Sequence, residues 1–330
     1  MMEKTDRKCR PDYLKAIAAI LVVLGHALTY LNNLDRLQGS WRIAESLIYA
    51  VHVPLFFAVA GYLCHRQPVG KFYRKKLMRI LIPFLTFTVL KLLYNVVFSG
   101  EAVSMGLLKS AFLYGNYYWF CYAILLMFLI APLMWRRDDK TGVTVISVVI
   151  LIVCLVLQVA FTVKESDGYG PFQILQVIYC YPFFFAGYFF KQYEKSLKRL
   201  MVPALAVGAG LTVLYLYIDL NGMEERLFYF PVRTAASLAL IVGVTALSGM
   251  IPEGFDRFSF LGRISLQIML FDSFYKVILF KIAERIGFMH PVMCIPITAL
   301  DIALTVLTCI LIRKLPYIRI LFGLESQKYT

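Results

Sequence analysis

The sequence has few charged residues and no long polar stretch. Charged side chains make up 16% of its 330 residues, and hydrophobic ones make up 60%. Soluble domains carry about 25% charged residues, so this deficit excludes an ordinary water-soluble protein and is typical of helices that face lipid. Because no polar stretch is long enough to fold as a second unit, we expect residues 1–330 to form a single transmembrane domain.

The sequence also lacks a metal-binding pattern. None of its seven cysteines lies at the spacing of metal ligands. Most fall within apolar segments, where free cysteine behaves as a small buried apolar side chain. They are Cys9, Cys64, Cys121, Cys154, Cys180, Cys294 and Cys309. We therefore expect no metal site.

The excess of positive charge follows the topology of the chain. The net charge is +14, which in a soluble protein would suggest nucleic-acid binding. Here the lysines and arginines form short clusters between apolar segments, and these clusters alternate with cation-poor loops. The clusters lie in the N-terminal segment 4–10, in the expected loops 66–79, 136–140 and 191–199, and in the C-terminal segment 313–328. By the positive-inside rule these segments and both termini are cytoplasmic, and we expect no nucleic-acid partner.

Ten apolar segments have about the 20 residues that a helix needs to cross a bilayer. They are 13–32, 43–64, 80–98, 117–135, 143–163, 171–190, 200–219, 231–250, 259–280 and 292–312. An even number of spans agrees with two cytoplasmic termini. The sequence therefore predicts an all-α fold, a polytopic bundle of about ten transmembrane helices in a lipid bilayer.

The first apolar segment carries two ionisable side chains, Lys15 near its start and His26 well inside it. Their separation corresponds to roughly 1100° of helical rotation, so both side chains share one face. The rise between them is about 16 Å, roughly half the hydrocarbon thickness of a bilayer. An ionisable residue at that depth is energetically costly and indicates a functional site. The alternative is a histidine that only hydrogen-bonds a neighbouring helix.

Five motifs, in order along the chain, resemble those of a known family. They are Lys15 and His26 with ten residues between them; His52-Val53-Pro54-Leu55-Phe56-Phe57 with Gly61-Tyr62-Leu63; the basic residues 71–79 with Pro83; Tyr118-Trp119-Phe120 with Pro132; and Gly262-Arg263-Ile264-Ser265. The set resembles the acyltransferase 3 family of membrane O-acyltransferases, in the branch related to fucose O-acetylases. Three positions depart from that pattern: Lys15 replaces arginine, Ala60 replaces serine, and Asp272 stands near a place where the family often has histidine.

The resemblance implies transfer of an acyl group, commonly acetyl, from cytoplasmic acetyl-coenzyme A to a carbohydrate acceptor. The acceptor would be a hydroxyl of a surface glycan or a lipid-linked sugar, at a bacterial inner membrane. A sugar hydroxyl is a weak nucleophile, and a neutral imidazole within hydrogen-bond reach can take its proton during attack. We therefore predict His26 as the general base, with Lys15 and His52 as further catalytic residues. A covalent acyl-histidine is a less favoured variant.

Cations and an aromatic ring indicate where the two substrates bind. Coenzyme A carries phosphates, which arginine and lysine bind through charge-assisted hydrogen bonds, so we predict Arg79, Lys76 and Arg74 as donor-binding residues. The same cluster also fits topology alone or attraction to anionic lipid. Trp119, at the external start of its span, and Asp12 are predicted to bind substrate. A tryptophan at that depth is equally typical of an interfacial belt.

Two intramembrane residues have more than one interpretation, and a third needs a partner. Lys15 contacts a donor phosphate, pairs with Asp12 three positions earlier, or extends to the membrane surface. His52 meets His26 across the first helical hairpin, where it orients that ring or binds the acceptor, or it makes an interhelical hydrogen bond. Asp301 lies inside the last span and needs a partner. We expect Asp301 to have a structural role.

Two other classes of protein fit part of the pattern. A transporter or flippase of lipid-linked sugars also has many spans and intramembrane ionisable residues, although the paired halves with broken helices common in transporters are not evident. A membrane sensor with a degenerate site is compatible with the departures at Lys15, Ala60 and Asp272. Transfer of a labelled acetyl group from acetyl-coenzyme A to glycan distinguishes the enzyme from both.

Overall fold

The computed structural model describes residues 10–65, 67–135, 140–163, 173–193, 201–223, 228–252 and 254–324. Several residues used in the sequence analysis lie outside these ranges, among them Cys9, Arg136, Arg137 and Lys195. The side of the membrane on which each terminus lies therefore stays a prediction. The six described cysteines are free and buried, as expected.

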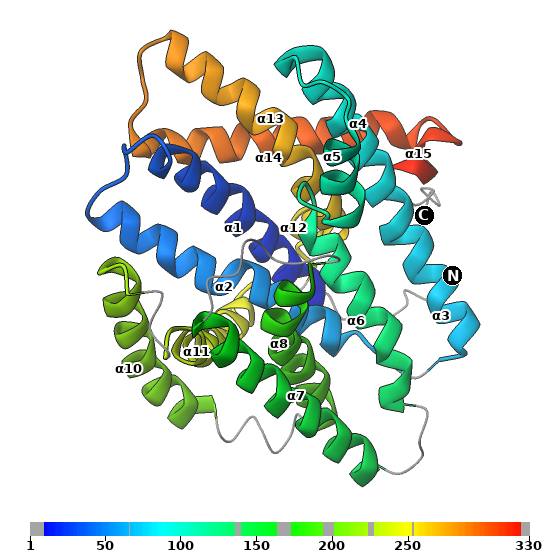
Figure 1. Ribbon diagram of the computed structural model, residues 1–330, viewed down its shortest axis with the longest axis vertical. Coiled ribbons are helices and arrows are strands. Elements are labelled where there is room, and N and C mark those ends of the chain that lie inside the picture. The colour runs from blue at the N-terminus through cyan, green and yellow to red at the C-terminus, as the bar shows by residue number, and fades with distance from the viewer. Residues whose placement is uncertain are drawn as a thin grey trace.

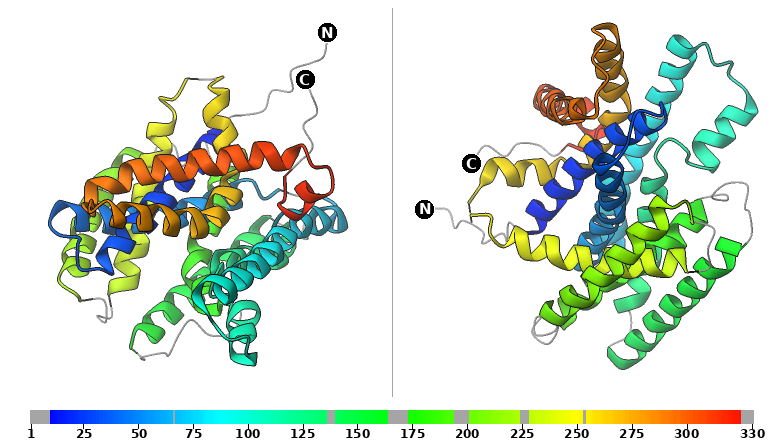
Figure 2. Two further views of the ribbon diagram at one scale, coloured as in Figure 1. Left: turned by 90° about the horizontal axis from the view of Figure 1, so that it is seen from above. Right: turned by 90° about the vertical axis from the view of Figure 1, so that its left-hand side faces the viewer.

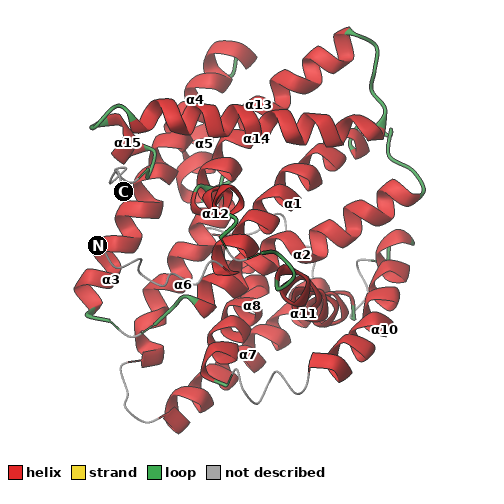
Figure 3. Cartoon of the chain, turned by 180° about the vertical axis from the view of Figure 1, so that it is seen from behind, coloured by secondary structure: helices red, strands yellow, loops and turns green. Residues whose placement is uncertain are grey.

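Every described secondary-structure element is helical, which confirms the all-α prediction (Figure 3). The long helices are α1 (Arg10–Asn32), α2 (Ser40–Tyr62), α4 (Ile82–Ser99), α6 (Trp119–Trp135), α7 (Lys140–Val163), α8 (Ile174–Gln192), α10 (Met201–Leu220), α11 (Tyr229–Ser248), α13 (Ser265–Arg285) and α14 (Cys294–Arg313). The short ones are α3 (Val69–Lys76), α5 (Met105–Leu108), α12 (Asp256–Arg263) and α15 (Ile318–Leu321), with helical turns η1 (Leu77–Leu81), η2 (Lys109–Leu113) and η4 (Pro291–Met293).

Seven helices in the described part of the chain are long and apolar enough to cross a membrane. They are Arg10–Asn32, Ser40–Tyr62, Val69–Phe98, Ile174–Lys191, Pro203–Leu220, Tyr229–Ser248 and Pro291–Arg313. Two further predicted spans, 117–135 and 143–163, fall on α6 and α7, in which shorter apolar stretches, Trp119–Pro132 and Val148–Val159, are found. The chain thus has the helices of a multi-pass membrane protein, and the count of ten spans stays a prediction.

The predicted span 259–280 is two helices instead of one. α12 ends at Arg263, α13 begins at Ser265, and Ile264 between them leaves the helical conformation with φ −105° and ψ 16°. α13 also carries Asp272 and Lys276 in its middle. Charged side chains lower the hydropathy of a helix, so this segment gives a weaker membrane signal than its neighbours.

The basic segment 71–79, expected as a loop, is helical. α3 passes through the π-helical turn η1 directly into α4, and the whole run Val69–Phe98 has the length and hydropathy of a span. Pro83 does not end the helical run: it lies in the first turn of α4, directly after the π-helical turn η1. The prediction of a loop is therefore wrong.

The first two helices lie in the middle of the molecule. α1 packs against α2, α12, α13 and α14, while α2 packs most extensively against α8 (Figure 1). Figure 2 shows α13 and α14 on one side of this central pair and α7, α8 and α10 on the other. Residues on α1 and α2 are therefore surrounded by side chains from the middle and from the C-terminal part of the sequence.

Glycines set the close contact between α2 and α8. A Cβ atom added at Gly61 would overlap the backbone carbonyl of Phe184, and one added at Gly187 would overlap that of Ala58. Small residues at helix crossings let two backbones approach closely in a membrane. The two glycines thus fix α2, and with it His52, against the second half of the bundle.

The variant Gly61→Ala should lower the melting temperature of the detergent-solubilised protein. The added methyl has no room, and overpacking of this kind costs about 1–3 kcal/mol. Gly210→Ala in α10 is the matched control, because nothing lies within 4 Å of a Cβ there and alanine is the better helix former. Equal melting temperatures for the two variants would contradict the packing role of Gly61.

Candidate active site

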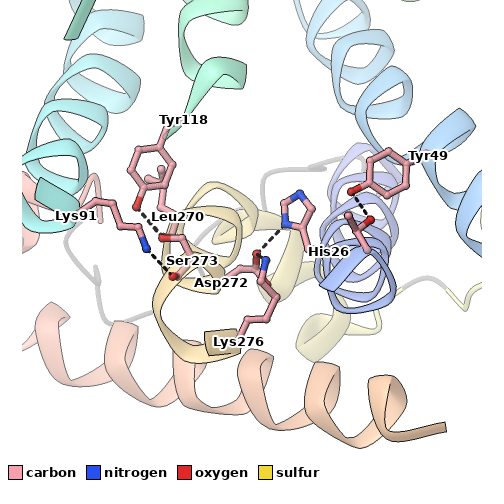
Figure 4. A network of polar contacts seen from close by, with 9 residues as sticks. His26, Tyr49, Lys91, Tyr118, Leu270, Asp272, Ser273 and Lys276 are labelled. Atoms are coloured by element: carbon pink, nitrogen blue, oxygen red, sulfur yellow. Dashed lines mark hydrogen bonds and ion pairs between the residues drawn. The ribbon is translucent and has the colours of Figure 1, made fainter. Parts of the chain in front are cut away.

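His26 contacts residues from two other helices that are distant in sequence. Its Nδ1 lies 2.7 Å from Oδ2 of Asp272 in α13, a residue 246 positions away. Its ring centroid lies 6.3 Å from that of His52 in α2, edge to face. Figure 4 shows the imidazole of His26 directed at Asp272. The two histidines therefore meet across the first helical hairpin, and a carboxylate from the other end of the chain contacts His26.

The bond to Asp272 determines which nitrogen of His26 is basic. A carboxylate accepts, so Nδ1 donates its hydrogen and Nε2 of the neutral ring keeps its lone pair. Such an aspartate holds the imidazole in one orientation and stabilises the imidazolium that forms when Nε2 takes a proton. The His26 side chain is 36% exposed. The ring is therefore not sealed among aliphatic neighbours.

Asp272 is itself held by a lysine one turn along α13. Lys276 Nζ lies 3.1 Å from the same Oδ2 that accepts from His26. The carboxylate is only 2% exposed, and this cation offsets the cost of burying it. Asp301 in α14 is fully buried; the Lys276 cation attracts its carboxylate, and the like charge of Asp272 repels it. These two residues are the neighbours that the sequence did not name for Asp301.

A chain of polar groups continues from the histidines along α1 and α2. His52 Nδ1 lies 2.6 Å from the Ile48 carbonyl of its own helix, so this nitrogen donates and Nε2 holds the lone pair. Tyr49 stands edge-on to His52 at 4.7 Å. Its hydroxyl lies 2.8 Å from that of Thr29, which in turn lies 2.7 Å from a Glu45 carboxylate oxygen. By the predicted topology this chain leads toward the external side.

On the other side of Asp272, two residues contact Ser273, which is the next residue of α13 (Figure 4). The Tyr118 hydroxyl lies 2.8 Å from that of Ser273, and Lys91 Nζ donates to the Ser273 carbonyl at 3.1 Å. Trp119, predicted to stack on a sugar, begins α6 and packs partly buried against the apolar core. The residue of this motif that reaches α13 is therefore Tyr118.

Lys15 and Asp12 form an ion pair at the start of α1. Lys15 Nζ lies 2.6 Å from Oδ1 of Asp12, which is the pairing that their three-residue spacing permits. Asp12 is buried, and the Lys15 side chain is 22% exposed. The pair lies on the same helix as His26 but about 16 Å away along its axis.

The three predicted donor-binding cations differ in their surroundings. Lys76 is partly buried, with Nζ 3.9 Å from the ring centroid of Phe128, and it interacts electrostatically with Lys15 and Arg79. Arg79 and Arg74 are exposed. The structure thus gathers Lys76, Arg79 and Lys15 at one end of the bundle.

Sequence reasoning missed Asp272 and Lys276 as site residues. They stand four positions apart on one helix, where opposite charges pair, within an otherwise apolar segment. Such an intramembrane pair by itself indicates a functional site.

In the described part of the chain no group of three or more His, Cys, Asp or Glu residues has the arrangement of a metal site.

Comparison with known proteins places these residues in a family. Residues 10–314 match the family model described as "Acyltransferase domain", the acyltransferase 3 family. The nodulation protein NolL of Sinorhizobium fredii is 31% identical over 193 residues, which cover 55% of this chain and 48% of that protein. NolL of Mesorhizobium japonicum is 27% identical over 189 residues, covering 55% of this chain and 47% of that protein.

The chain spans about half the length of the curated relatives it matches. No solved structure matches it significantly. The family model covers nearly the whole chain, including α1, both histidines and Asp272. The chain therefore belongs to the acyltransferase 3 family.

Proposed function

We propose that this protein is a membrane O-acyltransferase. It moves an acyl group, in the first instance acetyl, from cytoplasmic acyl-coenzyme A to a hydroxyl of a surface glycan or lipid-linked sugar at a bacterial inner membrane. The observation that carries the proposal is the 2.7 Å bond between His26 and a buried carboxylate, on a ring that is 36% exposed. Family membership supports the reaction class.

In the proposed reaction His26 acts as the general base. Nε2 takes the proton of the acceptor hydroxyl while the oxygen attacks the thioester carbonyl carbon, and Asp272 stabilises the imidazolium. The tetrahedral intermediate then expels the coenzyme A sulfur. The new C–O bond forms the ester and the C–S bond breaks. The leaving thiolate then takes from His26 the proton that came from the acceptor hydroxyl. The histidine is thereby returned to its starting form.

The donor is proposed to enter at the end of the bundle where the cations gather. Lys76, Arg79 and Lys15 would hold the coenzyme A phosphates there through charge-assisted hydrogen bonds. Asp12 would hold Lys15 in place through their ion pair. Arg74 projects from the exposed side of α3 and belongs to the outer edge of this group.

The acceptor is proposed to reach His26 from the opposite side. His52 lies beside the catalytic ring, and its Nε2 lone pair would accept a hydrogen bond from an acceptor hydroxyl. The Tyr49, Thr29 and Glu45 chain leads to that position. Trp119 stays a candidate for stacking on the sugar.

Replacing Lys76 with methionine should raise the KM for acetyl-coenzyme A by about tenfold and change kcat little. Methionine keeps the apolar contact with Phe128 but removes the charge, and a hydrogen bond to a charged group contributes about 1.5–3 kcal/mol. Steady-state kinetics at saturating acceptor measure this. Lys109→Met, on η2 outside the cation group, is the control, and equal KM values in both variants would argue for a lipid-facing role of Lys76.

The proposed function is tested by following a labelled acetyl group. Proteoliposomes containing the purified protein are given acetyl-labelled coenzyme A and lipid-linked sugar extracted from the source membranes. Label in an ester bond of the sugar supports the transferase. Movement of the sugar across the bilayer without label would instead support a flippase.

A further inference from the structure

An apolar groove opens between α12 and α14, away from His26. It has a volume of about 550 Å³, which is in the range of ligand pockets. Its apolar lining residues are Phe255, Phe258, Phe260, Leu261, Val306 and Ile310. Asp256 and Arg257 also line it, and their opposite charges offset each other. A groove of this composition suits a hydrocarbon chain.

Two arginines share one aromatic ring of this groove. The guanidinium carbon of Arg313 lies 4.9 Å from the centroid of Phe260, and that of Arg263 lies 5.8 Å from it. Neither arginine forms an ion pair with a carboxylate of the described residues. Arg263 donates to the Ser259 hydroxyl, whereas Nε of Arg313 is buried without a hydrogen-bond partner in the described chain.

The two guanidinium groups are near enough to repel each other, and an anion bound by both would offset that repulsion. Arginine binds phosphate in a planar, two-pronged geometry, and its stacking on an aromatic ring leaves the N–H groups at its edge free for such contacts. The cation pair and the apolar groove meet at Phe260. Their combination fits a ligand with an anionic head and an apolar tail.

We propose that this groove binds an anionic phospholipid. The headgroup phosphate lies on Arg263 and Arg313, and an acyl chain lies along Phe255, Phe258 and Ile310. By the predicted topology the site faces the cytoplasmic leaflet, which is the one rich in anionic lipid. The site is separate from the proposed transfer reaction and does not depend on it.

The groove is attached to the helix that carries His26. The Tyr13 hydroxyl donates to the Pro252 carbonyl and accepts from the Phe255 N–H, both at 3.1 Å. Gly262 of α12 lies so close to α1 that a Cβ there would overlap the backbone carbonyl of Asp12. The proposed lipid site therefore lies on a helix that is packed directly against the start of α1.

The test compares retained lipid in purified protein by native mass spectrometry. The delipidated full-length protein is mixed with equal amounts of phosphatidylglycerol and phosphatidylcholine in detergent. We expect at least tenfold more phosphatidylglycerol than phosphatidylcholine to stay bound, and a ratio near one in the Arg263→Gln/Arg313→Gln variant. The single variant Arg263→Gln, at an exposed position, should reduce the ratio even if the double variant folds poorly. Arg319→Gln, a partly buried cation on α15, should leave it unchanged.

Three results would overturn the proposal. Equal retention of the two lipids by the unmodified protein would mean that the groove does not select an anion. An unchanged preference in Arg263→Gln would place the anion elsewhere. Displacement of phosphatidylglycerol by free coenzyme A would assign the two arginines to the acyl donor instead of to a lipid.

Discussion

Replacement of His26 with glutamine should reduce acetyl transfer by about 10²–10⁴-fold, the usual contribution of a general base. Glutamine preserves the polarity and approximate length of the side chain but cannot take a proton from a sugar hydroxyl at neutral pH. Binding of acetyl-coenzyme A should change little, because the cations proposed for the donor lie about 16 Å along α1. The loss should therefore appear in kcat.

The control for this variant is His65→Gln. His65 is exposed, and its only hydrogen bond among the described residues is to the Leu63 carbonyl. It should keep full activity. Membrane insertion and melting temperature are measured for both proteins, so that a folding defect is not mistaken for loss of the base. Full transfer activity in His26→Gln would remove the assignment.

The second large effect is expected for Asp272→Asn. An amide has nearly the shape of the carboxylate but carries no charge and offers an N–H₂ group toward Nδ1 of His26. It therefore favours the tautomer with its lone pair on Nδ1, leaves Nε2 protonated, and no longer stabilises the imidazolium. In serine hydrolases the equivalent change lowers kcat by about 10⁴-fold, and we expect about 10²–10⁴-fold here with KM values nearly unchanged.

Removal of the Asp272 charge also leaves Lys276 without its partner. The double variant Asp272→Asn/Lys276→Gln keeps the charge balanced, so it separates a lost catalytic role from a destabilised bundle. It should fold as well as the native protein and stay inactive. Asp35→Asn is the matched control, since Asp35 is exposed with φ 55°, a conformation that asparagine tolerates. Native kcat in the double variant would show that Asp272 only balances charge.

The sequence was sufficient to predict what depends on local pattern. α1 is one helix that carries Lys15 and His26, as predicted. An apolar run with a polar start can be recognised in the sequence without knowledge of tertiary contacts. The meeting of His26 with His52 also followed from chain order, since two consecutive antiparallel spans are neighbours. Span 259–280 was harder to predict, because Ile264 interrupts the helix and two charged side chains lower its hydropathy.

The partner of His26 could not be predicted from spacing. Asp272 lies 246 positions away, and its proximity depends on how α13 packs against α1 in the assembled bundle. The departure from the family pattern near this position indicated that the site differs there, but not how. A carboxylate that accepts from Nδ1 explains the departure chemically, because it orients the imidazole. The groove at Phe260 likewise depends on contacts between α12 and α14 that no local pattern encodes.

The most direct test asks whether His26 catalyses transfer between a thioester that enters from the cytoplasmic side and an alcohol that enters from the opposite side. Membrane vesicles of both orientations are given membrane-impermeant acetyl-labelled coenzyme A, and ester-bound label is measured on the glycan. We predict label only when the cytoplasmic face is outermost, and none with His26→Gln. Label that appears only in vesicles of the opposite orientation, or that persists in the variant, would contradict the account.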